Sequence, residues 1–337
     1  MKKYNVAILG ATGAVGQEML KVLGERNFPY NELKLLASKR SAGTEVEFQG
    51  KTYVIEEATE NSFENIQVVL CAAENDISEA LSPAAVKAGA VVVDNSSAFR
   101  LFDDVPLVVP EVNGEDVKNH KGIIANPNCS TIIALTALNE LNKYSKINRM
   151  VVSTYQAVSG AGVNGIKELD QQIKDISEGN PVQINTFQHQ IAYNLIPQIG
   201  GFDENGYSSE EMKLQNEGRK IFHNPDLKVN CTCVRVPVYR SHSESITIET
   251  EKEITVEKVK ELLSKADGVK LVDDLDNKKY PMPLDTTNQD LIFVGRIRKD
   301  ISAENSLVLW CCGDQVRKGA ATNAVQIAEV LVKENLI

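Results

Sequence analysis

Apolar and polar positions alternate in short blocks over the first 128 residues. Short apolar runs, each typical of a buried strand, occur at Tyr4–Leu9, Leu33–Ala37, Val68–Ala72, Ala90–Val93 and Ile123–Ala125. Helical spacing predicts helices between them, at about Ala14–Leu23, near Ser78–Ala88 and near Gly114–Lys118. Strands that alternate with helices predict a parallel sheet covered by helices. We therefore expect an α/β domain over residues 1–128.

The pattern changes after residue 128. Longer strand-like runs occur at Asn148–Ala157, Val229–Val238, Glu244–Glu249, Leu291–Arg298 and Ser306–Cys312. Helices are predicted at Val163–Ile176, Glu210–Ile221 and Val256–Lys265. This spacing predicts a mostly antiparallel sheet with inserted helices, in a second domain over residues 129–314. The last helix, about Lys318–Lys333, has an apolar stripe, so we expect residues 315–337 to pack back on the first domain.

Composition narrows the class of protein. The chain has 337 residues, of which 42% are hydrophobic and 24% charged, as in an ordinary globular protein of two domains. Its net charge of -10 makes nucleic acid and anionic membranes poor partners, and an anionic substrate would need local cations. No apolar run approaches the roughly 20 residues that span a bilayer. The start, Met1-Lys2-Lys3, leads into a strand and not into a signal sequence, so we expect a cytoplasmic protein.

Cysteine and histidine usage gives no sign of a metal site or a disulfide framework. Six cysteines in a chain of this length do not suggest disulfides. The sequence has no C-x-x-C, and its four histidines lie far apart. We therefore expect no metal.

A glycine-rich turn follows the first predicted strand. The segment G-A-T-G-A-V-G begins at Gly10, and a helix is expected directly after it. Gly10 and Gly13 permit a tight turn, Gly16 permits close packing, and a pyrophosphate would lie on the helix N-terminus. The spacing G-x-x-G-x-x-G differs from the usual G-x-G-x-x-G, and a packing turn without a ligand is the alternative.

The end of the second strand indicates which dinucleotide would bind. An NAD site has an Asp or Glu there for the ribose hydroxyl, whereas this chain has Ser38, Lys39, Arg40 and Ser41. Two cations and two hydroxyls suit a 2'-phosphate. NADP is therefore favoured over NAD, and the alternative is a solvated loop pair.

Cys129 lies at the predicted start of a helix, in the sequence N-P-N-C-S-T. Asn126 and Asn128 can cap this helix, and Pro127 fixes its entry. The helix N-terminus would favour a thiolate, which makes Cys129 a candidate nucleophile. The alternative is that Cys129 is a small buried hydrophobic residue.

Taken together, several motifs resemble those of the aspartate-semialdehyde dehydrogenases over nearly the whole chain. They are G-A-T-G-A-V-G at 10–16, D-N-S-S-A-F-R at 94–100, N-P-N-C-S-T at 126–131, Q-A-V-S-G-A-G at 156–162 and R-V-P-V-Y-R-S-H-S at 235–243. The resemblance implies a Rossmann-like NADP-binding domain plus an α+β catalytic and dimerisation domain. It also implies NADPH-dependent conversion of aspartyl phosphate to aspartate semialdehyde and phosphate through a cysteine thioester. This reaction belongs to lysine, threonine, methionine and diaminopimelate biosynthesis.

The same resemblance implies roles for individual residues. Cys129 would be the nucleophile, His242 the acid-base residue, and Gln156 the residue that orients the substrate. The implied substrate ligands are Arg235 for the carboxylate, Arg100 and Lys213 for the phosphate, and Glu210 for the ammonium. The implied cofactor ligands are Gly10, Thr12, Gly13, Ala14, Val15, Ser38, Arg40, Ser41, Ser159, Gly160 and Gln315. Glu210 is followed by Glu211 and Lys213, a pattern that also occurs on solvated helix faces.

The resemblance also implies the partners of the protein. They are a small-molecule substrate and further copies of the chain, since the family forms homodimers, sometimes paired into homotetramers.

Other interpretations of the sequence stay open at this point. N-acetyl-glutamyl-phosphate reductases share the two-domain plan, but their motif reads N-P-G-C-Y where this chain has Asn128 and Ser130. Malonyl-CoA reductases resemble the family still more closely. A non-catalytic NADP-binding homologue would be expected to lack Cys129 or His242, and both are present.

Overall fold

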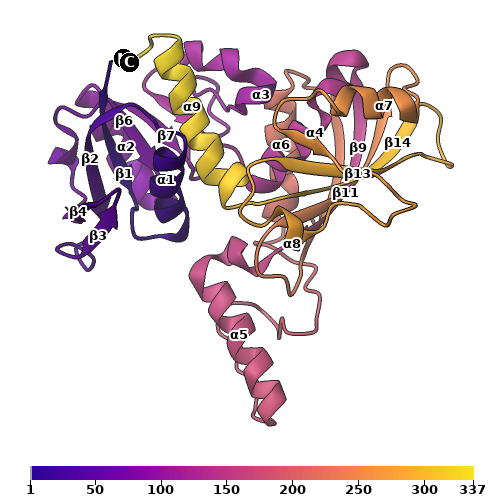
Figure 1. Ribbon diagram of the computed structural model, residues 1–337, viewed down its shortest axis with the longest axis horizontal. Coiled ribbons are helices and arrows are strands. Elements are labelled where there is room, and N and C mark those ends of the chain that lie inside the picture. The colour runs from indigo at the N-terminus through magenta and orange to yellow at the C-terminus, as the bar shows by residue number, and fades with distance from the viewer. Residues whose placement is uncertain (1) are drawn as a thin grey trace. The chain divides into compact units, whose positions relative to one another are not determined.

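A six-stranded parallel sheet forms the centre of the first of two units (Figure 1). The computed structural model describes residues 2–337, so Met1, at the start of the predicted cofactor domain, lies outside the described residues. Unit 1 contains residues up to Asn128 together with Ala320–Ile337, and unit 2 contains Cys129–Gly319.

The sheet of unit 1 has the strand order β5-β2-β1-β6-β7-β8. All of its pairs are parallel, which is the arrangement of a dinucleotide-binding fold. The strands are β1 (Tyr4–Leu9), β2 (Tyr30–Ala37), β5 (Glu56–Glu57), β6 (Val68–Cys71), β7 (Val91–Asp94) and β8 (Ile123–Ala125). A small hairpin of β3 (Glu45–Phe48) and β4 (Lys51–Val54) was not predicted.

Helices of unit 1 bury their apolar stripes against this sheet. They are α1 (Ala14–Glu25), α2 (Asn75–Lys87), the short α3 (Pro110–Asn113) and α9 (Thr322–Lys333), with the 3-10 turns η1 (Glu60–Phe63) and η2 (Gly114–Asn119). The segment near Gly114–Lys118, predicted as a helix, is thus a 3-10 turn. The α9 residues Val325, Ile327 and Leu331 are fully buried in the same core as Val6 and Ile8 of β1. The end of the chain is therefore part of the core of unit 1.

Unit 2 contains a second six-stranded sheet, in the order β10-β9-β11-β14-β13-β12. Its strands are β9 (Ile147–Gln156), β10 (Lys228–Arg235), β11 (His242–Thr250), β12 (Val269–Leu271), β13 (Ile292–Lys299) and β14 (Ser306–Gly313). The three central pairs are antiparallel, and the pair at each edge is parallel, so the sheet is mixed. Strand β10 ends at Arg235, earlier than the predicted Val238, because Pro237 follows and has no N–H for a ladder.

One face of this sheet is covered by helices and the other is more open. The helix α4 (Cys129–Tyr144) packs on strands β9, β11, β13 and β14 and contacts α6 (Ser209–Ile221) and α7 (Val256–Leu263). The remaining elements are the turn η3 (Val158–Ala161), α5 (Gly162–Glu178), the short α8 (Pro283–Thr286) and the π-helical turn η4 (Arg317–Ala321). On the other face, half-buried side chains such as Val151, Thr247 and Val308 lie opposite one another.

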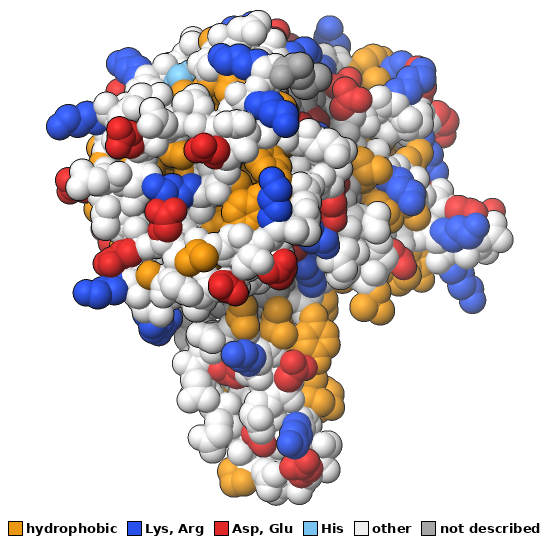
Figure 2. Space-filling model, turned by 60° about the vertical axis from the view of Figure 1, so that its left-hand side comes forward, with side chains coloured by type: hydrophobic (Ala, Val, Ile, Leu, Met, Phe, Trp, Pro, Cys, Tyr) orange, Lys and Arg blue, Asp and Glu red, His pale blue; other side chains and the backbone are white. Residues whose placement is uncertain are grey.

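Residues 162–196, which we call the arm, consist of α5 and the segment that returns to the sheet. Figure 1 shows α5 extending away from the sheet of unit 2. The arm has a small core of its own, formed by Leu169, Ile191, Ala192 and Ile196 with Val158. Figure 2 shows hydrophobic side chains along one side of the arm, and Ile184, Tyr193 and Leu195 are among those exposed.

Among residues 2–337, no helix is both long and apolar enough to cross a membrane.

Candidate active site

Three neighbouring strands of unit 2 bring Arg235, Gln156 and His242 into one row. Arg235, the last residue of β10, lies opposite Gln156, the last residue of β9. In the pairing of β9 with β11, Ser243 lies opposite Tyr155, which places His242 beside Gln156. Paired residues share a face of a sheet, and all three side chains are at least nine-tenths buried. We call them the site row.

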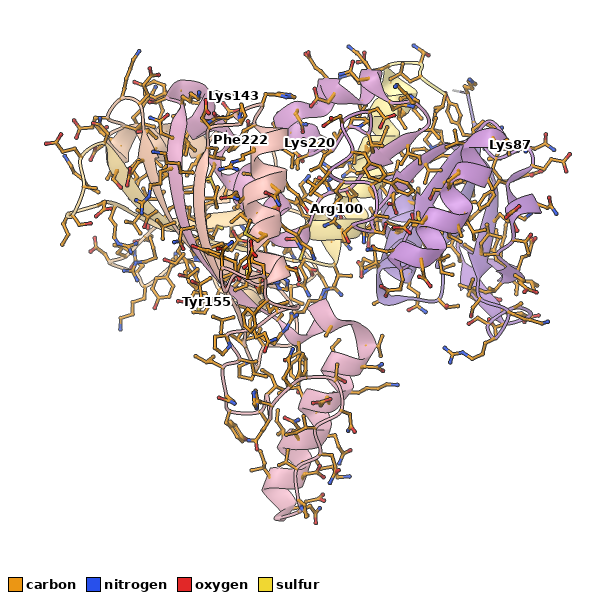
Figure 3. The ribbon with its side chains drawn as sticks, turned by 180° about the vertical axis from the view of Figure 1, so that it is seen from behind. Lys87, Arg100, Lys143, Tyr155, Lys220 and Phe222 are labelled. Atoms are coloured by element: carbon orange, nitrogen blue, oxygen red, sulfur yellow. The ribbon has the colours of Figure 1, made fainter. Side chains whose placement is uncertain are left out.

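Two helices begin at this end of the sheet. Cys129 is the first residue of α4, and Glu210 is the second residue of α6. Figure 3 shows the other ends of these helices, marked by Lys143 for α4 and by Lys220 and Phe222 for α6, far from Tyr155, which precedes Gln156. Both helix N-termini therefore point to the site row, where their dipoles favour negative charge.

His242 is fully buried, and the main chain fixes its protonation state. Its Nδ1 atom accepts a hydrogen bond from the Ala157 N–H at 3.0 Å, so the proton of the neutral ring lies on Nε2. Burial and, secondarily, the positive charge of Arg235 lower the pKa of His242 to about 3, against a smaller opposite effect of Glu210. At neutral pH the ring is therefore an uncharged hydrogen-bond donor.

The Gln156 amide is held in one orientation. Thr154 donates from its hydroxyl to Gln156 Oε1 at 3.0 Å, which directs the amide nitrogen away from Thr154. That nitrogen donates to Glu210 Oε1 at 3.1 Å and lies 3.4 Å from His242 Nε2. Because both nitrogens carry protons, they cannot bond to each other, but they can both donate to one oxygen of a ligand.

Glu210 is a buried member of the site and does not lie on a solvated helix face. Its side chain accepts from Gln156 and from Lys213 Nζ, the latter at 2.9 Å, and its residue is 8% exposed. Lys213 lies one helical turn later, and its side chain is 32% exposed. The pair thus presents both charges at one place.

Arg235 approaches the site through a gap left by a glycine. Its Nη1 donates to the Ala157 carbonyl at 2.7 Å. A Cβ atom on Gly160 would lie 2.6 Å from this Nη1 and 3.3 Å from His242 Cε1, so only glycine leaves both side chains in place. Burial lowers the pKa of Arg235, whereas the negative charge of Glu210 and, less strongly, Cys129 act in the opposite direction. A guanidinium near a cysteine is an environment in which a thiolate is favoured.

A second set of contacts joins Gln315 to the site row. Gln315 Oε1 accepts from the Ser241 N–H at 2.8 Å, and Gln315 Nε2 donates to the Ser159 hydroxyl. Ser241 has a φ of +76°, a left-handed conformation that is rare outside glycine, directly before His242. The structure thus brings two predicted cofactor ligands, Ser159 and Gln315, together around a strained residue.

Sequence reasoning missed three of these residues. Thr154 lies outside the quoted motifs, and Ser241 lies inside the motif at 235–243 but was given no role there. Their roles follow from the strand register and from the hydrogen bonds above. Gly319 was not singled out either, although a Cβ on it would lie 2.9 Å from Cys129 Cβ. The only available signal for Gly319 was a glycine inside a predicted helix.

In unit 1, the glycine-rich turn has the form that a dinucleotide needs. Gly10 has a φ of +86°, and a Cβ on Gly16 would lie 2.2 Å from the Gly10 carbonyl oxygen. Helix α1 begins at Ala14, and no side chain caps its N-terminus. Gly13 and Thr12 are exposed, while Ala14 and Val15 are partly exposed. Exposed main-chain N–H groups at a helix start suit a pyrophosphate, so these residues fit the cofactor implied by the sequence.

The remaining predicted ligands of unit 1 lie in two loops. Ser38 and Arg40 are exposed in the turn after β2, where the Ser41 N–H donates to the Ser38 carbonyl at 2.8 Å. Arg100 follows β7, is 7% exposed, and donates from Nη2 to the Asn95 carbonyl at 2.8 Å. Within the described part of the chain, no group of three or more His, Cys, Asp or Glu side chains could hold a metal ion.

Comparison with known proteins gives consistent matches. Residues 5–120 match the model of the semialdehyde dehydrogenase NAD binding domain, and residues 138–318 match that of the semialdehyde dehydrogenase dimerisation domain. The aspartate-semialdehyde dehydrogenase of Bacillus subtilis is 52% identical over 99% of both chains, and that of Aquifex aeolicus is 54% identical over 99% of both.

Solved structures also match over the full chain. Aspartate semialdehyde dehydrogenase II of Vibrio cholerae, complexed with ASA, has a TM-score of 0.97 and 48% identity and covers 99% of both chains. The Candida albicans aspartate semialdehyde dehydrogenase with NADP has a TM-score of 0.79 and 27% identity over 100% of both chains.

Proposed function

Because the chain belongs to the aspartate-semialdehyde dehydrogenase family of enzymes, we propose that it reduces L-4-aspartyl phosphate to L-aspartate 4-semialdehyde with NADPH and releases phosphate. The family, the two-part fold and the enzyme class predicted from the motifs are confirmed. The observation that carries the proposal is the site row of unit 2, onto which the N-termini of α4 and α6 point with Cys129 and Glu210. The product would supply lysine, threonine, methionine and diaminopimelate biosynthesis.

Cys129 begins the proposed reaction as a thiolate. Its sulfur attacks the acyl carbonyl carbon, the carbon–oxygen bond to phosphate breaks, and phosphate leaves with the electron pair. A thioester on Cys129 remains. NADPH, when bound, supplies the hydride that reduces this thioester.

Gln156 and His242 then stabilise the oxygen of the tetrahedral adduct on Cys129. Their two Nε2 donors lie 3.4 Å apart, close enough for one oxyanion to accept from both. When the adduct collapses, its oxygen re-forms the carbonyl and the thiolate leaves, so this step needs no proton from the enzyme. A neutral His242 with a pKa of about 3 is sufficient as a donor. We therefore assign His242 a hydrogen-bonding role in place of the acid-base role implied by the resemblance.

The charged residues account for the other groups of the substrate. Arg235 would bind the α-carboxylate through its fork, and Glu210 would accept from the ammonium. Lys213 and Arg100 would bind the phosphate. A carboxylate, an ammonium and a phosphate thus each meet a group of opposite charge.

For the cofactor, we propose NADP over NAD. The support is the turn after β2, where Ser38, Lys39, Arg40 and Ser41 offer hydroxyls and cations and no carboxylate. The pyrophosphate would lie at the uncapped start of α1 with Gly10, Thr12, Gly13, Ala14 and Val15. Ser159, Gly160 and Gln315 would contact the nicotinamide end.

We further propose that the protein is a homodimer, or a homotetramer built from such dimers. The matched dimerisation domain implies self-association, and the open face of the unit 2 sheet presents the half-buried Val151, Thr247 and Val308 in one row. A charge in this row would disrupt a sheet-to-sheet interface. Sedimentation of Val308→Lys should show a smaller particle than the wild type, and an unchanged particle would exclude this face.

The reaction is tested in the reverse direction. Aspartate semialdehyde, phosphate and NADP are mixed with the protein, and absorbance at 340 nm is followed, with reactions lacking phosphate or containing NAD as controls. Phosphate-dependent formation of NADPH is expected. Activity only with N-acetyl-glutamate semialdehyde, or CoA-dependent activity with malonate semialdehyde, would favour an N-acetyl-glutamyl-phosphate reductase or a malonyl-CoA reductase. No activity with any of these, from folded protein, would indicate a non-catalytic homologue.

A further inference from the structure

The side chain of Arg235 lies against the arm as well as against the site row. Its guanidinium carbon is 5.9 Å from the centre of the Phe187 ring, within the roughly 6 Å over which a cation is attracted to an aromatic face. Phe187 belongs to the segment of the arm that follows α5, and no motif marked it. Arg235 is only 7% exposed, so this contact is largely removed from water.

The arm also holds the main chain of Arg235. The Arg235 N–H donates to the Ile196 carbonyl at 2.8 Å, and the Ile196 N–H donates to the Arg235 carbonyl at 3.0 Å. Ile196 belongs to the small core of the arm, against which Phe187 also packs. The position of Arg235 is thus tied to the arm through both its backbone and its side chain.

Phe187 is itself anchored to α5. The buried carboxylate of Glu168 accepts from the main-chain N–H groups of Asn185 and Thr186, and from that of Phe187 at 3.5 Å. Beside the ring, a Cβ on Gly165 would lie 3.1 Å from Phe187 Cζ. The ring therefore has a defined place and is not a loosely attached surface side chain.

A guanidinium binds a carboxylate well only when its plane is fixed, because the two parallel N–H bonds must point at the two oxygens together. On Arg235, Nη1 is directed to the Ala157 carbonyl, which fixes one end of the fork. A single hydrogen bond still leaves rotation about its own axis. An aromatic ring against the guanidinium restricts that rotation.

We infer that Phe187 is a positioning residue for substrate capture, because its ring holds the plane of the Arg235 guanidinium toward the substrate carboxylate. The inference rests on the role proposed above for Arg235. It assigns the arm a part in the affinity for the substrate, while phosphate binding and hydride transfer depend on other residues.

The size of the effect follows from the contact. Cation–π contacts are worth about 0.5 to 2 kcal/mol, which corresponds to about a 2- to 30-fold change in affinity. Phe187→Leu keeps an apolar side chain and removes the ring. In the reverse assay we expect its KM for aspartate semialdehyde to rise by about 2- to 30-fold, with kcat and the KM for phosphate within about twofold of the wild type. Phe187→Tyr retains the ring and should restore the wild-type KM.

Ile173→Ala is the matched control. Ile173 packs against the same small core of the arm as Phe187, so its truncation loosens the arm without removing the ring. Its KM for aspartate semialdehyde should stay within about twofold of the wild type. If Phe187→Leu does not fold, judged by circular dichroism, Phe187→Met replaces it as a non-aromatic variant of similar volume.

Arg235→Lys separates failure of this inference from failure of the proposed function. Suppose that the wild type is active and that Arg235→Lys raises the KM for aspartate semialdehyde. An unchanged KM in Phe187→Leu would then overturn the positioning role alone. Ile173→Ala raising the KM as much as Phe187→Leu would also overturn it, because general loosening of the arm would then be the cause. An active wild type with an unchanged KM in Arg235→Lys would remove the carboxylate clamp, and a wild type without phosphate-dependent NADPH formation would refute the proposed reaction.

Discussion

The buried Glu244 tests whether the interior of unit 2 keeps a carboxyl group uncharged. It lies two residues after His242 on β11 and therefore on the same face, in a row with Thr154, Cys233 and Cys311 directly next to the site row. The residue is fully buried, and neither of its carboxyl oxygens has a hydrogen-bond partner among the described residues. Burial, and to a lesser extent Cys233, raise the pKa of Glu244 well above its ordinary value. It is thus held as a neutral acid.

This burial gives the stability of the protein a defined dependence on pH. In the unfolded chain Glu244 loses its proton above its ordinary pKa of 4.5, whereas the raised pKa keeps it protonated in the folded protein. The unfolded state then binds fewer protons, so the free energy of unfolding falls as the pH rises from 4.5 to the raised pKa. Glu244→Gln has no proton to lose. The free energy of unfolding of Glu244→Gln, relative to that of the wild type, should therefore rise by up to about 2.5 kcal/mol between pH 5 and pH 7.

Urea unfolding at pH 5, 6 and 7 measures this difference. Trp310, the only tryptophan of the chain, lies in β14 beside β11 and reports unfolding of unit 2 by its fluorescence. His242 contributes in the opposite direction, because its lowered pKa makes stability fall as the pH drops below about 6.5. Both proteins contain His242, so comparing Glu244→Gln with the wild type at each pH cancels this contribution. The control is Glu249→Gln, on the opposite face of the same strand, where Glu249 is half-buried and pairs with Arg149. A Glu244→Gln advantage that is the same at pH 5 and pH 7 would refute the reasoning.

Four further outcomes are expected. Cys129→Ser should fold normally but lose turnover by orders of magnitude in the reverse assay, and near-normal turnover would contradict its role as nucleophile. Nitrogen NMR of His242 at pH 5.5 should show a neutral ring protonated at Nε2, because its pKa is about 3, and a charged ring at that pH would be incompatible with this. Thr154→Val removes the hydroxyl that orients Gln156 and should lower kcat about tenfold, with Thr154→Ser close to the wild type; an unaffected Val variant would show that the amide needs no such support. Arg40→Ala should raise the KM for NADP about 10- to 100-fold and leave that for NAD unchanged, whereas equal increases would argue against a 2'-phosphate contact.

The elements of the fold were predictable where hydrophobic periodicity is strong. Strands β1, β6 and β7 are almost entirely apolar, apart from Asn5 and Asp94, because both faces of a parallel sheet are covered. The hairpin β3–β4 could not be found in this way, since most of its residues are exposed and only a few, such as Val46 and Tyr53, pack on the core. The parallel pairs at the two edges of the unit 2 sheet were equally hidden, because strand direction depends on connections and not on the pattern within a strand.

The residues of the candidate site were predictable where a short sequence motif contains them. Cys129 at a helix start and His242 in a distinctive run could be identified from the sequence. The supporting residues could not, because their roles depend on register and on loop paths. In the sequence, Thr154 is an ordinary strand threonine, and only the structure shows its hydrogen bond to Gln156. Phe187 is likewise an ordinary loop phenylalanine in the sequence, and only the path of the arm brings it to Arg235.

The neutral state of Glu244 bears on how a strongly acidic protein would capture the anionic substrate proposed above. With His242 and Glu244 uncharged, the charged side chains at the site are Arg235, Glu210, which accepts from Gln156, and Lys213, which pairs with Glu210. Two cations therefore accompany one anion. This local excess of positive charge would stabilise a thiolate on Cys129 and would still offer a cation to the proposed substrate, although the chain as a whole carries -10. An ionised Glu244 two residues from His242 would cancel that excess. The same burial that destabilises the protein as the pH rises therefore keeps the site suitable for an anion.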